Sequence, residues 1–357
     1  MKVFVSILLY PFSLIYGLVT FIRNVFFDWG ILPSEKFDLP VISVGNLSMG
    51  GTGKTPHVEY LTDILKDQYT IGILSRGYRR KTSGFYLADE HSDAKTIGDE
   101  PMQFYKRYIN DGVYIAVDEN RVRGTKKLLE SKPDIDVLIL DDAFQHRWIK
   151  SGLNILLTDF FHPFYEDYVV PSGRLREFRF GAKRADIIVV SKSGKVLSPI
   201  TRRTIEEKIK PRPHQSLYFS FIDYGEPRPL PGMESYPGWG KTYAILLVTG
   251  IANPYPLENK VAAECTELHK LQYPDHHKFS IDDAKKIRKT FEEIISQNKI
   301  IITTEKDAMR LSSKSILEIL SDLPIFYWPI HVDLHSKDKE AFNSEILDYV
   351  RENKANR

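Results

Sequence analysis

A glycine-rich segment near the start of the chain has the composition of a phosphate-binding loop. Residues 48–55 follow the form G-x-x-x-x-G-K-[ST], with a serine in place of the first glycine. Glycines let backbone N–H groups turn toward phosphate oxygens, Lys54 can reach the terminal phosphates, and the Thr55 hydroxyl can bind Mg²⁺. The segment therefore predicts a nucleoside triphosphate site. Its expected contacts are Ser48, Met49, Gly50, Gly51, Thr52, Gly53, Lys54 and Thr55.

Two adjacent carboxylates, Asp141 and Asp142, end the apolar run that begins at residue 137. Mg²⁺ prefers oxygen ligands and usually takes one or two carboxylates beside phosphates and water. We therefore expect both acids to lie beside the glycine-rich loop and hold the metal. The competing interpretation is a solvated pair at a strand end. Gln145 and His146 follow directly, and a structural role is equally open for the histidine.

Proton transfer and charge neutralisation have weaker candidates. Asp99 lies in a Gly-Asp-Glu-Pro turn, where it could accept the proton of a hydroxyl nucleophile, although a local helix cap is the commoner role. One histidine of the pair His276 and His277 could assist it; ordinary surface histidines are the alternative. Residues 173–177, Gly-Arg-Leu-Arg-Glu, offer arginines for phosphate and Glu177 for Mg²⁺, but such a segment is often a solvated charge cluster.

The elements that must position these groups are apolar runs of buried-strand type alternating with helices. The glycine-rich loop lies between a run at 41–44 and a helical pattern at 54–66. Alternating buried strands and helices predict an α/β fold with a mostly parallel sheet covered on both faces. The other strand-like runs in this part of the chain are 70–74, 113–117, 137–140, 153–157 and 187–190.

The chain also divides into regions. Prolines at 211 and 213 interrupt the pattern, and a second αβ series follows, with strands near 244–248, 300–303 and 325–327. We expect an N-terminal hydrophobic helix in residues 1–30, a nucleotide-binding domain in 31–215, and a smaller α/β domain in 216–357 that closes over the cleft. The helices expected in the last region are 281–296 and 339–352.

The N-terminus is apolar enough to interact with a membrane. Residues 3–22 carry no charge, which is long enough to span a bilayer. Polar or small residues recur at helical spacing, which favours a helix that lies in the interface over one that spans; a buried core helix is the alternative. A cleaved signal peptide is disfavoured, because no small-residue cleavage site follows. The polar or small residues at this spacing are Ser6, Tyr10, Ser13 and Gly17.

Overall composition excludes some classes of function. The 357 residues include 49 Lys and Arg against 47 Asp and Glu, so the net charge is only +2. Nucleic-acid binding is not expected, because it requires a strongly basic surface. The single cysteine, Cys265, excludes an internal disulfide and a cysteine-based zinc site, and it suits a reducing cytoplasm.

The motifs, taken in order, resemble the tetraacyldisaccharide 4'-kinase family, and the resemblance covers about residues 1 to 310. Ala143, Phe144 and Arg174 depart from the expected Gly, Leu and Pro, which puts local backbone shape in doubt. The motifs that carry the resemblance are Gly-Asn-Leu at 45–47, Gly-Gly-Thr-Gly-Lys-Thr-Pro at 50–56, Ser-Arg-Gly-Tyr at 75–78, Gly-Asp-Glu-Pro at 98–101, Asp-Asp-x-x-Gln-His at 141–146, Pro-Ser-Gly-x-Leu-Arg-Glu at 171–177, Gly-Ile-Ala-Asn-Pro at 250–254, Pro-Asp-His-His at 274–277 and Thr-Glu-Lys-Asp at 304–307.

The resemblance implies ATP- and Mg²⁺-dependent phosphorylation of the 4'-hydroxyl of an acylated glucosamine disaccharide 1-phosphate, giving lipid IVA, at the cytoplasmic face of the inner membrane. It implies two α/β domains linked by a β-ribbon, and a membrane-embedded glycolipid acceptor with no obligate protein partner. Lys54, Thr55, Asp141, Asp142 and Glu177 would handle phosphates and metal, with Asp99 as base and His276 assisting. The acceptor contacts implied are Asn46, Arg76, Tyr78, Gln145, His146, Arg176 and His277.

Two other classes of nucleotide-binding protein compete. Deviant P-loop ATPases carry a lysine immediately before the glycine pair, where this chain has Met49, so that class is disfavoured. A membrane-bound nucleotide-switch ATPase stays open, and in it Asp99 and His276 would be structural.

Overall fold

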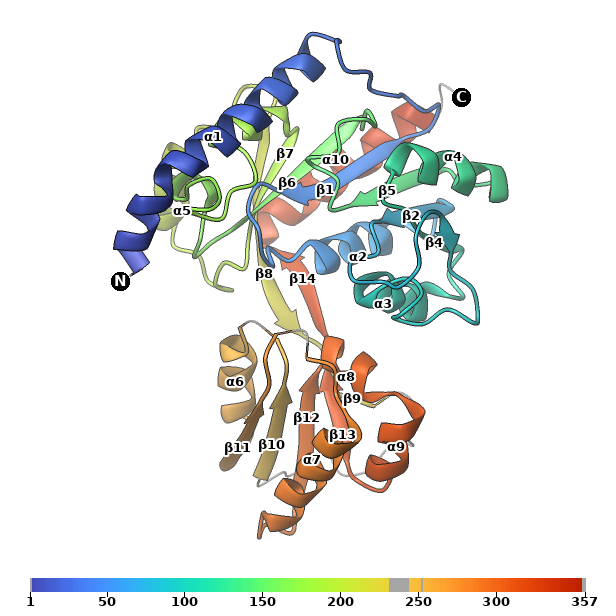
Figure 1. Ribbon diagram of the computed structural model, residues 1–357, viewed down its shortest axis with the longest axis vertical. Coiled ribbons are helices and arrows are strands. Elements are labelled where there is room, and N and C mark those ends of the chain that lie inside the picture. Colours follow the sequence, from blue (N-terminus) through green and yellow to red (C-terminus); the bar gives the residue numbers. More distant parts are fainter. Residues whose placement is uncertain (1, 231–243, 252, 276, 355–357) are drawn as a thin grey trace. The chain divides into compact units, whose positions relative to one another are not determined.

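The structure is a computed structural model that describes residues 2–230, 244–251, 253–275 and 277–354. The chain forms two compact units (Figure 1). The first unit is discontinuous, with one part up to Asp223 and another from His331 onward, and the second unit is Tyr224–Ile330. In Figure 1 the blue, green and yellow parts of the chain and the red C-terminal helix therefore belong to one unit.

The first unit is built on a sheet of nine strands within the described residues, in the order β14-β8-β7-β6-β1-β5-β2-β4-β3. The pairs from β4 through β8 are parallel, and β3 pairs with β4 antiparallel. The strands are β1 Val41–Asn46, β2 Ile71–Ser75, β3 Tyr86–Leu87, β4 Val113–Val117, β5 Val137–Asp141, β6 Leu153–Asp159, β7 Ile187–Ser191, β8 Ser216–Tyr224 and β14 Ile330–Leu334.

Helices cover both faces of this sheet, as the continuous apolar strands predict. In β5, Val137 and Ile139 pack on the face that carries α2 and α10, whereas Leu138 and Leu140 pack on the face that carries α4. The helices are α1 Lys2–Asp28, α2 Lys54–Leu65, α3 Asp99–Tyr108, α4 Arg121–Ser131, α5 Pro199–Ile209 and α10 Ser336–Lys354, with 3₁₀ turns η1 Phe164–Glu166 and η2 Arg179–Arg184.

Strand register sets the position of the candidate site. β1 lies between β5 and β6, and Val44 in β1 pairs with Asp141 at the end of β5. Because β1 and β5 are parallel, the loop after β1 and the acids after β5 emerge at the same edge of the sheet.

The second unit has a five-stranded sheet within the described residues, in the order β11-β10-β12-β13-β9. Its neighbouring strands are parallel, apart from the short β9. The elements are β9 Arg228–Pro229, β10 Ala244–Thr249, β11 Glu267–Gln272, β12 Lys299–Thr304, β13 Ile325–Trp328, α6 Tyr255–Ala262, α7 Ile281–Glu293, α8 Glu305–Leu311 and α9 Lys314–Leu320.

The α/β fold with a smaller second α/β unit is thus confirmed, but the expected domain boundary is wrong. The region 216–357 does not form one body, because β8 pairs with β7 and α10 belongs to the first unit. The apolar stripe of α10, at Phe342, Ile346 and Val350, is buried in the core that α2 shares with the large sheet. Burial of that stripe ties the end of the chain to the first unit.

Helix α1 is the apolar N-terminal helix expected from the sequence, and its segment Leu8–Asp28 is long and apolar enough to cross a membrane. The helix lies on the first unit with one face, which buries Ser13, Thr20, Asn24 and Phe27. At Gly17 the ring of Phe178 comes so close that any side chain larger than that of glycine would require the ring to shift. The buried-core-helix alternative is wrong, because most of the helix is exposed.

Candidate active site

The glycine-rich loop connects β1 to α2, as its sequence predicts. Gly50 and Gly53 adopt φ values of 119° and 85°, which side chains rarely tolerate. Apart from the glycine itself and its two chain neighbours, no described residue has a heavy atom within 4 Å of where a Cβ would stand at Gly50 or Gly51. The loop therefore has open space over its glycines, and α2 begins directly after it at Lys54.

Surrounding residues fix the loop before any ligand binds to it. The Asn46 amide donates to the Thr52 hydroxyl at 2.8 Å, and the Ser191 hydroxyl donates to the Thr52 carbonyl at 2.8 Å. Lys192 donates to the Gly51 carbonyl. These bonds come from the ends of β1 and β7, so the sheet itself holds the loop's shape.

Lys54 and Asp142 meet at this edge of the sheet. Their Nζ and Oδ1 atoms are 3.6 Å apart, and Arg176 donates to both Asp142 oxygens at 3.0 and 3.3 Å. Burial works to raise the pKa of Asp142, but the Lys54 and Arg176 charges outweigh it and lower that pKa. Asp142 is thus held ionised between two cations.

Asp141 has the properties of a metal-binding carboxylate. It is buried, and its Oδ1 atom has no hydrogen-bond partner among the described residues. Burial, together with the charge of Asp142, raises the pKa of Asp141 to about 6. An orphaned buried carboxylate oxygen favours a divalent cation. The described residues contain no cluster of three or more His, Cys, Asp or Glu suited to a metal.

Two residues beside Asp141 were missed in the sequence. Glu100 lies close enough to raise the Asp141 pKa, and its neighbour Asp99 is the first residue of α3. Arg121 is almost completely buried and donates to the Asp141 carbonyl at 2.9 Å; its burial lowers the Arg121 pKa to about 10. Glu100 could have been assigned to the site from the sequence, because it is adjacent to Asp99. The residues around Arg121 contain no motif that indicates its position beside Asp141.

Residues 5–351 match the family model described as tetraacyldisaccharide-1-P 4'-kinase.

The chain belongs to this family.

Among relatives of the tetraacyldisaccharide 4'-kinase family, the kinase of that name from Bacteroides thetaiotaomicron is 44% identical, covering 98% of this chain and 94% of its own. The one from Flavobacterium johnsoniae is 43% identical, covering 97% of each chain. A crystal structure of LpxK from Aquifex aeolicus in complex with ATP is similar with a TM-score of 0.73 and 28% identity, covering 97% of this chain and 99% of that one. The family resemblance and the enzyme class, a kinase, are therefore confirmed.

Glu177 occupies a different environment from that expected of a metal ligand in this kinase family. Its carboxylate is 2% exposed, and Arg184 donates to both oxygens at 2.8 Å. Asn24 and Gln145 donate to it as well, at 2.7 and 3.1 Å. With both oxygens accepting two bonds, the arrangement favours a supporting role over metal coordination.

Arg76 and His146 lie at the same edge of the sheet, and Tyr78 is exposed. His146 accepts a hydrogen bond from the Arg121 backbone N–H at 3.2 Å. Burial, followed by the charges of Arg121 and Arg76, lowers the His146 pKa to about 4, so this imidazole is neutral. The structure therefore favours the structural reading of His146. Tyr78 is 59% exposed, with the Arg79 guanidinium over its ring.

The two histidines of the second unit differ in what can be said of them. His276 lies outside the described residues. His277 bonds Asp283 at 2.9 Å and stacks on Tyr273 with 4.6 Å between ring centroids. His277 therefore supports the segment before α7. The pairing of a histidine with Asp99 stays a prediction.

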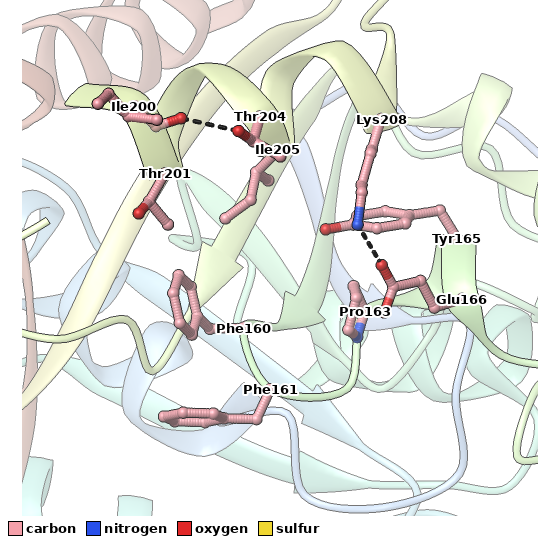
Figure 2. A pocket seen from close by; sticks show the side chains of 10 residues that line it. All are labelled: Phe160, Phe161, Pro163, Tyr165, Glu166, Ile200, Thr201, Thr204, Ile205 and Lys208. Carbon is pink, nitrogen blue, oxygen red and sulfur yellow. Dashed lines mark hydrogen bonds and ion pairs between the residues drawn. The ribbon is translucent and has the colours of Figure 1, made fainter. Parts of the chain in front are cut away.

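A pocket of about 310 Å³ lies on the first unit between the segment after β6 and helix α5 (Figure 2). Figure 2 shows Lys208 reaching Glu166, which it contacts at 2.6 Å, beside the Tyr165 ring. None of the residues predicted to bind nucleotide, metal or acceptor lines this pocket. Its lining is Phe160, Phe161, Pro163, Tyr165, Glu166, Ile200, Thr201, Thr204, Ile205 and Lys208.

Proposed function

We propose that this chain transfers the γ-phosphoryl group of ATP to the 4'-hydroxyl of a tetraacylated glucosamine disaccharide 1-phosphate, giving lipid IVA. The observation that carries the proposal is the 3.6 Å approach of Lys54 to Asp142, at the end of a glycine-rich loop, in a chain of this family. A loop of this kind binds the phosphates, and a carboxylate beside it serves the metal.

The nucleotide is held by the backbone N–H groups of residues 50–54 and by the Lys54 ammonium. Thr55, Asp141 and Asp142 suit Mg²⁺, because together they offer a hydroxyl, an orphaned buried carboxylate oxygen and an ionised carboxylate. When bound, Mg²⁺ neutralises charge on the β- and γ-phosphates. Arg176, already on Asp142, adds a second cation for the transferred group.

Asp99 receives the proton of the acceptor hydroxyl. As the new oxygen–phosphorus bond forms, the bond from the γ-phosphorus to the bridging oxygen breaks and ADP leaves. Asp99 is the first residue of α3, and its carboxylate can orient the hydroxyl and accept its proton. His276 assists Asp99, and Arg76 and Tyr78 contact the acceptor.

The acceptor's acyl chains stay in the bilayer, and α1 brings the enzyme to them. Its outward face exposes large apolar side chains that water solvates poorly. We therefore propose that the protein lies in the interface at the cytoplasmic face of the inner membrane. The proposed function involves neither nucleic acid nor an obligate protein partner. The exposed residues are Leu8, Phe12, Ile15, Leu18, Val19 and Ile22.

The test uses the purified full chain with Mg·ATP and the disaccharide 1-phosphate in detergent micelles. Mass spectrometry of the lipid should show one added phosphate at the 4'-position, and an acceptor already phosphorylated there should give none. Chelation of Mg²⁺ should stop transfer. ATP hydrolysis that is unaffected by the lipid, with no lipid product, would support the nucleotide-switch ATPase instead.

A further inference from the structure

A polar residue of α1 reaches into the active-site region. Asn24 is 5% exposed, and it lies within the long apolar segment Leu8–Asp28 of this helix. Its side-chain amide donates to Glu177 Oε2 at 2.7 Å, and its backbone carbonyl accepts from Arg147 at 2.7 Å. A buried asparagine is costly unless it is hydrogen-bonded, so these contacts orient α1 on the first unit.

Hydrogen bonds continue from Asn24 to the phosphate-binding loop. Glu177 Oε1 accepts from Gln145 at 3.1 Å, and Gln145 Oε1 accepts from Arg176 at 3.2 Å. The same Arg176 nitrogen donates to Asp142 at 3.0 Å, and Asp142 lies 3.6 Å from Lys54. Every link belongs to the first unit, so the series runs from α1 to the candidate catalytic groups without a break.

The Gln145 side chain connects the two halves of this series of hydrogen bonds. Its amide nitrogen donates to Glu177 and, at 2.8 Å, to the Asn46 carbonyl at the end of β1, which leaves its oxygen facing Arg176. The Arg23 guanidinium, also on α1, donates to the backbone carbonyl of Gln145 at 3.4 Å. Glu177 therefore selects the amide orientation that supports Arg176, and Asn24 holds Glu177 together with Arg184.

We propose that Asn24 is a positioning residue for phosphoryl transfer. Through Glu177 and Gln145 it fixes Arg176 against Asp142, so α1 is part of the active site as well as the membrane-binding element. The inference rests on the proposed kinase function. Residues that orient those contacting the reacting groups contribute about 10- to 100-fold to activity.

The experiment compares N24A and N24D with T20V in the detergent assay, where membrane binding does not limit the rate. N24D keeps the size of the side chain but places a carboxylate against Glu177. Thr20 lies one turn away on the same buried face, and within the described part of the chain its hydroxyl bonds only inside α1, to the Gly17 carbonyl at 2.9 Å. Rates are divided by the number of ATP-binding sites from calorimetry, so that unfolded protein does not count.

We expect N24A and N24D to lower kcat about tenfold or more while the KM for ATP changes less than about threefold, and T20V to stay within twofold. In a double-mutant cycle, N24A should cost little in an E177Q background, because the series is already broken. Wild-type kcat in N24D, or fully additive losses in the cycle, would overturn the inference. Absence of transfer by the wild type would instead overturn the proposed function on which it rests.

Discussion

The Arg176 guanidinium donates to both carboxylate oxygens of Asp142, at 3.0 and 3.3 Å. This pairing brings a residue from the segment before η2 to the end of β5, where Lys54 also lies 3.6 Å from the same carboxylate. Two cations and one ionised acid are thus gathered at the mouth of the glycine-rich loop. The first prediction concerns the lysine of this group.

Lys54→Met should abolish transfer and weaken ATP binding. The ammonium is the loop's own cation for the terminal phosphates, and removing such a group costs about 10²–10³-fold or more in rate. The matched control is Lys66→Met, whose lysine pairs with Asp111 at 2.7 Å in a partly exposed position. Calorimetric titration with ATP and single-turnover assays measure both effects, and a Lys54→Met enzyme at half the wild-type rate would contradict the assignment.

Asp99→Ala should cut transfer by about 10²–10⁴-fold, the usual contribution of a general base, while ATP still binds. Exposed Glu130 on α4 provides the control, since Glu130→Ala removes a carboxylate that faces water. The measurement is kcat at saturating substrates, beside ATP affinity. Normal turnover by the Asp99 variant would remove this residue from the mechanism.

Replacing outward residues of α1 should release the protein from membranes. Ile15 and Leu18 are 63% and 53% exposed, and each buried aliphatic side chain contributes roughly 1.5–3 kcal/mol. The double variant Ile15→Gln and Leu18→Gln should therefore bind phospholipid vesicles at least tenfold more weakly in sedimentation assays. Ile295→Gln, at an exposed position of the second unit, is the control. Unchanged vesicle binding would mean that another surface anchors the chain.

Stability should rise as pH increases from about 4 to 6.5. Burial lowers the pKa of both His57 and His146 to about 4 in the folded protein, below the value near 6.5 of an unfolded histidine. The unfolded state therefore binds more protons in this window, so acidification favours unfolding.

The matched measurement is urea unfolding of the wild type and of His146→Gln across this pH range. The slope of the unfolding free energy against pH should be smaller in His146→Gln than in the wild type by about 0.5–1 kcal/mol per pH unit, a value reduced because this histidine is only partly buried. Parallel curves for the two proteins would show that His146 is protonated alike in both states.

Asp338→Ala should destabilise the first unit by about 2–4 kcal/mol, because removing a buried carboxylate takes the acceptor from a partly buried guanidinium and from a buried backbone N–H. Asp338 is 4% exposed and accepts two bonds from Arg202, at 2.8 and 2.9 Å, and one from the Phe219 N–H. Glu207→Ala, which breaks an exposed pair with Arg203, should cost less than about 0.5 kcal/mol. Denaturant unfolding measures both, and equal effects would contradict the role of burial.

The strands around the loop were predictable because their apolar runs are continuous and short. The predicted runs at 41–44 and 137–140 became β1 and β5, and the order of loop and acids followed from the parallel arrangement. By contrast β11, Glu267–Gln272, was missed, since this edge strand is mostly polar and its two leucines, Leu268 and Leu271, form neither a continuous nor an alternating apolar run. The packing of α10 on the first unit was missed, because the apolar stripe of a helix does not indicate which surface the helix will pack against.

At the site, the sequence identified side chains but not their partners. Lys54 and Asp142 were expected together, and the structure brings them together. Glu177 was assigned to the metal on its charge, whereas its position among Arg184, Gln145 and Asn24 depends on a contact between α1 and a segment more than a hundred residues later. Local pattern does not encode contacts of that range.

The return of β14 and α10 to the first unit affects how the protein is made. The ribosome synthesises all of Tyr224–Ile330 before the remaining residues of β14 and the helix α10 that completes the larger sheet's core. The inserted unit can therefore fold while the kinase unit still lacks its last layer. During translation, the core of the first unit therefore stays incomplete until α10 has been synthesised.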